Sequence, residues 1–79
     1  MSAATKVKAP PELRAIMQSG RWRASILAAS KFAELGEQRG AILSAREAYL
    51  RPEFQRQLGR DPERLIKVGI AAMKVRYGE

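Results

Sequence analysis

The stretch from Asp61 to Gly78, DPERLIKVGIAAMKVRYG, decides the fold because it carries the clearest helix start and the widest apolar face in the chain. Asp61 suits an N-cap, where its carboxylate accepts a hydrogen bond from the first turn. Pro62 suits the first helical position, and Glu63 complements the positive end of the helix dipole. The sequence therefore predicts a helix over residues 62–77 that Gly78 stops.

One face of this predicted helix is strongly apolar, with large side chains at the i, i+4, i+7 and i+11 spacing of a single helix face. Four short helices do not obviously cover a face of this width, so it predicts an interface with a partner. The residues of that predicted interface are Leu65, Ile66, Ile70, Met73 and Tyr77. Gly69 costs about 1 kcal/mol relative to alanine in a helix interior but permits close approach of another helix. Opposite them, we interpret Arg64, Lys67 and Lys74 as a solvated face.

The first half of the chain predicts two helices and a loop. Pro11 opens a helix over residues 11–18, since proline lacks the amide hydrogen that would be unpaired there. The run from 21 to 35 contains no proline or glycine and has a helical apolar stripe, which predicts a second helix ended by Gly36. Residues 36–40 are polar between two glycines and predict a loop.

Two further short helices are expected before the last one. Ser44 and Glu47 have the spacing of a capping box, in which each side chain bonds the backbone amide of the other, so a third helix is expected to begin at Ala45. Pro52 bends the chain and opens a fourth helix that runs to about Leu58.

These elements predict an all-α fold, a small bundle of four to five short helices over residues 10–79 with a flexible basic N-terminal arm over residues 1–9. No stretch of useful length has the alternating period of a β-strand. A chain of 79 residues buries only about 60% of its unfolded surface. A second copy or a bound partner would therefore help to stabilise it.

The composition excludes most catalytic chemistry. The chain has 15 Lys and Arg against 8 Asp and Glu, a net charge of +7, and no His or Cys. It can therefore form no serine–histidine triad, thiol nucleophile, disulfide or ordinary zinc site. We expect no enzymatic activity, no cofactor and no metal.

The longest apolar run, 68–73, is far shorter than the roughly 20 residues of a membrane span. No signal-peptide core is present at the start, so we expect a cytoplasmic protein that does not bind membranes.

The positive charge is concentrated at the start of the chain. Residues 1–31 hold six basic residues and one acidic residue, a net charge of +5, whereas residues 32–79 carry only +2. Clustered Lys and Arg are the electrostatic footprint of a nucleic-acid-binding protein. The predicted phosphate contacts are Lys6, Lys8, Arg14, Arg21, Arg23 and Lys31.

Two features within the helices each have two interpretations. Arg21 and Arg23 flank the single tryptophan, Trp22, at the start of the second predicted helix, where a bound anion would relieve the repulsion between their charge and the helix dipole. Alternatively, Trp22 anchors the core while both arginines face water.

The bend at Pro52 either belongs to an ordinary bundle or forms a helix-turn-helix. The reading surface of that motif would carry Gln55, Arg56 and Arg60.

Two functions follow as hypotheses. The first is a small nucleic-acid-binding regulatory or accessory protein that contacts duplex DNA through phosphates, because neutralising phosphates supplies affinity without base readout. Duplex is favoured over single strands because only five aromatic residues are present and most lie on predicted apolar stripes. The alternative is a protein-interaction or oligomerisation module, a homodimer or a binder of an acidic protein surface, that uses the apolar face of the last helix.

Overall fold

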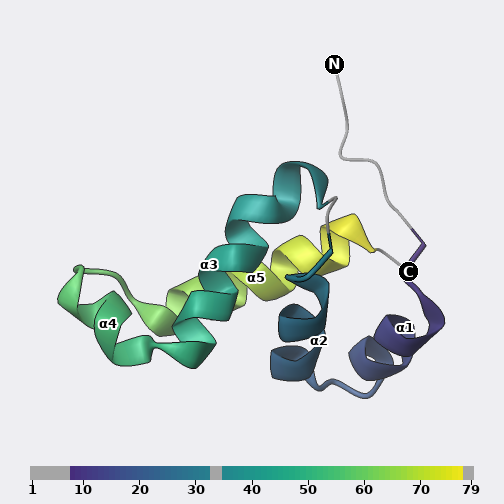
Figure 1. Ribbon diagram of the computed structural model, residues 1–79, viewed down its shortest axis with the longest axis horizontal. Helices are drawn as coiled ribbons and strands as arrows, with labels where there is room; N and C mark the ends of the chain where they lie inside the picture. Colours follow the sequence, from purple (N-terminus) through teal and green to yellow (C-terminus); the bar gives the residue numbers. More distant parts are fainter. Residues whose placement is uncertain (1–7, 33–34, 78–79) are drawn as a thin grey trace.

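The computed structural model describes residues 8–32 and 35–77, which form five α-helices, one 3₁₀ turn and no strand (Figure 1). The all-α class is therefore confirmed. The elements are α1 (Pro11–Gln18), α2 (Trp22–Ala29), η1 (Gly36–Gln38), α3 (Arg39–Leu50), α4 (Pro52–Gln57) and α5 (Pro62–Arg76).

The longest helix, α5, crosses α3 at the centre of the molecule (Figure 1). Its predicted start is confirmed, because Asp61 Oδ1 accepts a hydrogen bond of 3.0 Å from the Glu63 amide. The two helices meet at Gly69, where an added Cβ would overlap the Cβ of Ala45 and lie 3.3 Å from the carbonyl oxygen of Ala41. The close approach predicted at Gly69 is thus confirmed, and it sets the separation of the two helices.

The core lies where α2, α3 and α5 meet. Ile26, Ile42 and Met73, one from each helix, are fully buried. Ser25 is also fully buried, and its hydroxyl donates to the carbonyl oxygen of Arg21 at 2.9 Å, so this polar group is satisfied within its own helix.

Two helices, α1 and α4, end in the same type of glycine turn. After α1, the amide of Gly20 donates to the carbonyl of Met17 at 3.0 Å, and the amide of Arg21 donates to that of Ile16 at 3.3 Å. An equivalent pair of bonds, at 3.0 and 2.9 Å, ends α4 at Gly59. Both glycines have a φ near +80°, the left-handed conformation that this Schellman pattern requires.

The second predicted helix is too long. It was expected to continue to residue 35, but α2 ends at Ala29. The Ser30 hydroxyl donates to the carbonyl of Leu27 at 2.8 Å. The chain then leaves the helix in a tighter turn, in which the Phe32 amide donates to the carbonyl of Ala29, three residues earlier. This departure places the Phe32 ring edge-on against Tyr77, with 6.4 Å between ring centroids, so tertiary packing overrides the local helical pattern.

The start of the third predicted helix is also wrong. α3 begins at Arg39 rather than Ala45, and Ser44 is an interior helical residue instead of a cap. Ile42 and Ala45 are both fully buried, and burying both on one face favours a helix that continues back through the predicted loop. The carboxylate of Glu47 pairs with Arg46 rather than reaching back to the amide of Ser44.

Only the last two residues of the predicted arm, Lys8 and Ala9, lie among the described residues. Residues 1–7, including Lys6, lie outside the described residues. Lys8 is exposed, but Ala9 is buried and belongs to the same apolar cluster as Leu13 of α1. Ala9, which the sequence assigned to the arm, therefore contributes to the core.

The close contact at Gly69 predicts an unusual response to alanine. Gly69→Ala should lower the free energy of unfolding by about 1 to 3 kcal/mol, because overpacking against Ala45 outweighs the gain in helix propensity. Gly40→Ala is the matched control, since Gly40 is also helical but has no atom within 4 Å of an added Cβ. That variant should gain up to about 1 kcal/mol. Urea unfolding followed by circular dichroism measures both, and an unchanged or more stable Gly69→Ala protein would contradict the packing.

Candidate nucleic-acid interface

The predicted phosphate contacts that lie among the described residues do not form a single cluster. Arg21 and Arg23 are exposed at the start of α2, whereas Lys31 is exposed beyond its other end. An eight-residue helix is about 12 Å long, so these two groups are well separated. Lys8 is exposed before α1, and Arg14 is half-buried on α1. The structure therefore brings together Arg21 and Arg23 but not the whole predicted set.

Arg21 is held at the turn between α1 and α2. Its Nε donates to Ser19 Oγ at 2.8 Å, and that hydroxyl donates to the carbonyl of Ile16 at 2.7 Å. The backbone carbonyl of Arg21 accepts the amide of Ser25 at 3.0 Å, which starts α2. The guanidinium is thus tethered to an ordered turn while remaining exposed.

Trp22 connects the start of α2 to α5. The ring is half-buried against the core, which supports the interpretation of Trp22 as an anchor. The ammonium Nζ of Lys74 lies 5.5 Å from the centroid of its ring, within the range of a cation–π interaction. Sequence reasoning missed this contact because the two residues are far apart in the chain and nothing local pairs them.

Arg23 faces a different neighbour, Tyr49 of α3. Burial raises the pKa of Tyr49 from its ordinary value of 10.0, and the positive charge of Arg23 acts in the opposite direction by favouring the phenolate. Arg21, Arg23 and Lys74 therefore all lie close to the start of α2, which carries exposed positive charge from two helices.

The outer face of α5 is exposed from its first turn to its last. The exposed residues of this outer face are Glu63, Arg64, Lys67, Val68, Ala71, Lys74 and Val75. The rise of a helix makes the face about 18 Å long, and Lys67 and Lys74, seven residues apart, lie on the same edge. The exposure expected for Arg64, Lys67 and Lys74 is confirmed, while the exposed valines between them were not anticipated.

The predicted partner interface on α5 is largely the chain's own core. Met73 is fully buried and Tyr77 is 4% exposed, so neither is available to a partner. Leu65, Ile66 and Ile70 are half-buried. The prediction underestimated how much of this face α2 and α3 cover, because sequence alone did not show that Gly69 lets α3 approach so closely.

Three large apolar side chains are exposed elsewhere, one at the end of α3, one on α4 and one at the C-cap of α4. Leu50, Phe54 and Leu58 are 43%, 48% and 51% exposed. They recur every four residues across the bend at Pro52, a spacing that could have been noticed in the sequence but was interrupted there by the proline. We call these three residues the α4 apolar patch.

The predicted reading surface of a helix-turn-helix at this bend is wrong for one residue. Gln55 is 3% exposed, and its Oε1 accepts a hydrogen bond of 3.4 Å from Nη1 of Arg60. Arg56 is exposed but pairs with Glu53 at 2.8 Å. A buried glutamine cannot contact a base edge, so Gln55 is not part of a reading surface, whereas Arg56 and Arg60 are exposed.

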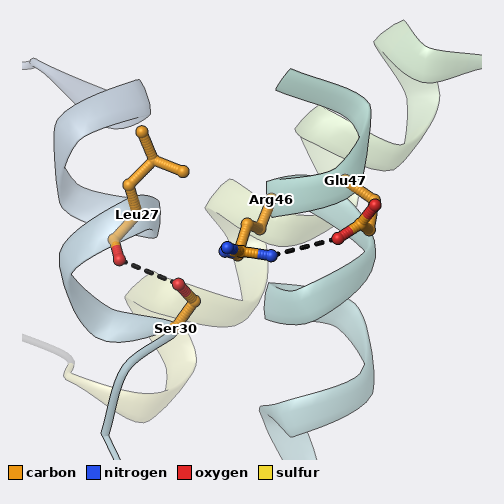
Figure 2. A network of polar contacts seen from close by, with 4 residues as sticks. All are labelled: Leu27, Ser30, Arg46 and Glu47. Carbon is orange, nitrogen blue, oxygen red and sulfur yellow. Dashed lines mark hydrogen bonds and ion pairs between the residues drawn. The ribbon is translucent and has the colours of Figure 1, made fainter. Parts of the chain in front are cut away.

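Arg46 is neutralised within its own helix. Figure 2 shows its side chain between α2 and α3, where Nη1 lies 3.0 Å from Glu47 Oε2. The nearby contact of Ser30 with Leu27 stays within α2 and its cap. Arg46 is therefore a weaker candidate for a phosphate contact than the exposed basic residues near Trp22, which are Arg21, Arg23 and Lys74.

Other kinds of site find no support in the described ranges 8–32 and 35–77. No group of three His, Cys, Asp or Glu residues there is placed to hold a metal ion. No helix in those ranges combines the length and apolar character needed to cross a membrane. Comparison with known proteins found no matching family model, curated protein or solved structure.

The contact between Lys74 and Trp22 predicts a small stabilisation. Lys74→Gln should lower the free energy of unfolding by about 0.5 to 1 kcal/mol, because it removes the cation from an exposed cation–π pair. It should also shift the emission of Trp22, the single tryptophan. Lys67→Gln, which removes the same charge two turns earlier on α5, is the control. If both variants lose equal stability, the effect is one of general charge and the contact contributes nothing.

Proposed function

We propose that this chain is a small, basic, non-enzymatic protein that binds duplex DNA as a regulatory or accessory factor. The observation that carries the proposal is the position of Lys74 over Trp22, which joins the start of α2 to the outer face of α5. The phosphate contacts that we propose are Arg21, Arg23, Lys67 and Lys74, and we call them the basic surface. Lys8, which is exposed before α1, and Lys6, which lies outside the described residues, stay predicted phosphate contacts.

Charge supports DNA as the partner. All four residues of the basic surface are exposed, and the whole chain carries a net charge of +7. Lysine and arginine that contact phosphates release condensed counterions, which gives affinity for any duplex sequence. An acidic protein surface would also attract these residues, and it is the alternative partner that the binding experiment below tests.

The aromatic side chains favour duplex over single-stranded nucleic acid. One face of Trp22 is occupied by Lys74, and Tyr77 is buried against Phe32. Tyr49 is half-buried. Single-strand binders need exposed rings on which successive bases stack, and in the described part of the chain only Phe54 is exposed.

Binding to generic duplex DNA should depend strongly on salt. Four phosphate contacts give a slope of about −3.6 for log K against log salt concentration, so affinity should fall roughly a hundredfold between about 50 and 200 mM salt. Fluorescence anisotropy with a labelled duplex of mixed sequence measures this. A chain that shows no binding at the lower salt concentration is not a DNA-binding protein.

A pair of variants tests the location of the contacts. Arg23→Gln with Lys74→Gln should make the slope shallower by about 1.8, since each lost contact accounts for about 0.9. Arg51→Gln with Arg56→Gln removes the same charge at α4, which lies apart from α2 (Figure 1). This control should leave the slope unchanged. Equal effects of the two pairs would mean that binding is not confined to the basic surface.

The α4 apolar patch favours a second function, self-association. Leu50, Phe54 and Leu58 are large apolar side chains with nearly half of their surface exposed. A small domain gains stability by burying such residues against another copy. The oligomerisation hypothesis is therefore retained, but the proposed interface is on α4. It is not on α5, where Met73 and Tyr77 are buried.

Sedimentation equilibrium tests this second function. If the α4 apolar patch joins two copies, the chain should be dimeric at micromolar to millimolar concentration, and Phe54→Asp should make it monomeric. Val75→Asp places the same charge at another exposed apolar position, on α5, and should leave the dimer intact. A wild-type chain that remains monomeric throughout that range does not use the patch for self-association.

A further inference from the structure

The outer face of α5 combines exposed apolar and exposed basic side chains. Arg64, Val68, Ala71 and Val75 occupy positions i, i+4, i+7 and i+11 and form one exposed stripe along the helix. Val68 and Val75 are 47% and 40% exposed. The centre of this face therefore presents small apolar side chains to the solvent.

Positive charge flanks this stripe along one edge. Lys74 lies over Trp22, and Lys67, seven residues earlier, is on the same edge of α5; both belong to the basic surface. Glu63, in the first turn, is the single acidic residue of the outer face. The face thus combines a small apolar centre with a cationic border, and it is continuous with the proposed phosphate contacts.

These features match the major groove of duplex DNA. The groove is about 12 Å wide and admits one α-helix. Small apolar side chains contact the methyl group of thymine there, arginine donates to guanine, and lysines beside them reach the phosphates of the groove wall. A face about 18 Å long would follow roughly five base pairs at about 3.4 Å each.

The packing of α5 holds this face in place. Gly69, on the inner side, lies against Ala45 with no room for another carbon atom. Asp61 caps the first turn. A helix fixed at its centre and its start presents its outer side chains at defined positions, which recognition of base edges requires.

We infer that α5 enters the major groove with its outer face, so that Arg64, Val68 and Ala71 meet base edges while Lys67 and Lys74 contact phosphates. This inference rests on the proposed function, because it requires duplex binding. It adds to that function the groove that is occupied and the residues that contact bases rather than the backbone.

A duplex with a blocked major groove tests the inference. Two duplexes of the same sequence are compared, one with cytosine and one with glucosylated 5-hydroxymethylcytosine, whose sugar fills the major groove without changing the phosphate charge. We expect binding to the modified duplex to be at least tenfold weaker. Equal binding to both would overturn the major-groove inference while leaving DNA binding in place. No binding to the unmodified duplex would overturn the proposed function, and this inference with it.

A second measurement uses a variant on the face itself. Ala71→Glu places an acidic side chain at the centre of the exposed stripe, where it would meet the base edges and phosphates, and should weaken binding to the unmodified duplex at least tenfold. Gln57→Glu makes the same change in charge at an exposed position of α4 and should change affinity less than threefold. Circular dichroism confirms that both variants remain folded. Equal losses of affinity would mean that α5 does not face the DNA.

Discussion

The contact of Gly69 with Ala45 is the constraint on which the rest of the structure depends. It brings α5 and α3 closer than two helices with larger side chains would allow, and Ile26 of α2 then packs against the same point, 3.5 Å from where a Cβ at Gly69 would lie. A domain of 79 residues has little apolar surface to bury, so close packing at its centre contributes a large share of its stability. The glycine lowers helix propensity at the position where α5 gains most from packing.

The parts of the fold that depend on local chemistry could be predicted from the sequence. Asp61 caps α5, and Gly20 and Gly59 end helices in the left-handed conformation that glycine adopts without strain. The two boundaries that were wrong depend on distant contacts. α2 stops early because Phe32 packs on Tyr77, and α3 starts early because its face must cover the core. Tyr77 lies far from the end of α2 in the sequence, so the local helical pattern could not show its contact with Phe32.

The candidate site was predictable only in part, for a related reason. Arg21 and Arg23 were identified from local charge, and both are exposed. Lys74 was interpreted as part of a solvated face because the distance along the chain hides its position over Trp22. The sequence placed most of the net charge in the first 31 residues and most of the apolar surface in the last helix. Folding removes that separation, since the apolar face of α5 turns inward and its basic face joins the arginines of α2.

This arrangement gives α5 two roles that are linked by helix geometry. Residues on opposite sides of a helix lie about two positions apart in sequence, so a helix that buries Gly69 and Met73 must expose Ala71 and Val75. The inner face needs small and apolar residues to fit against α3, whereas nothing in the core constrains the outer face. The core therefore does not determine which residues stand at these exposed positions. In the proposed contact with the major groove, a thymine methyl group and a small side chain would exclude water from each other, while Lys67 and Lys74 would reach the phosphates.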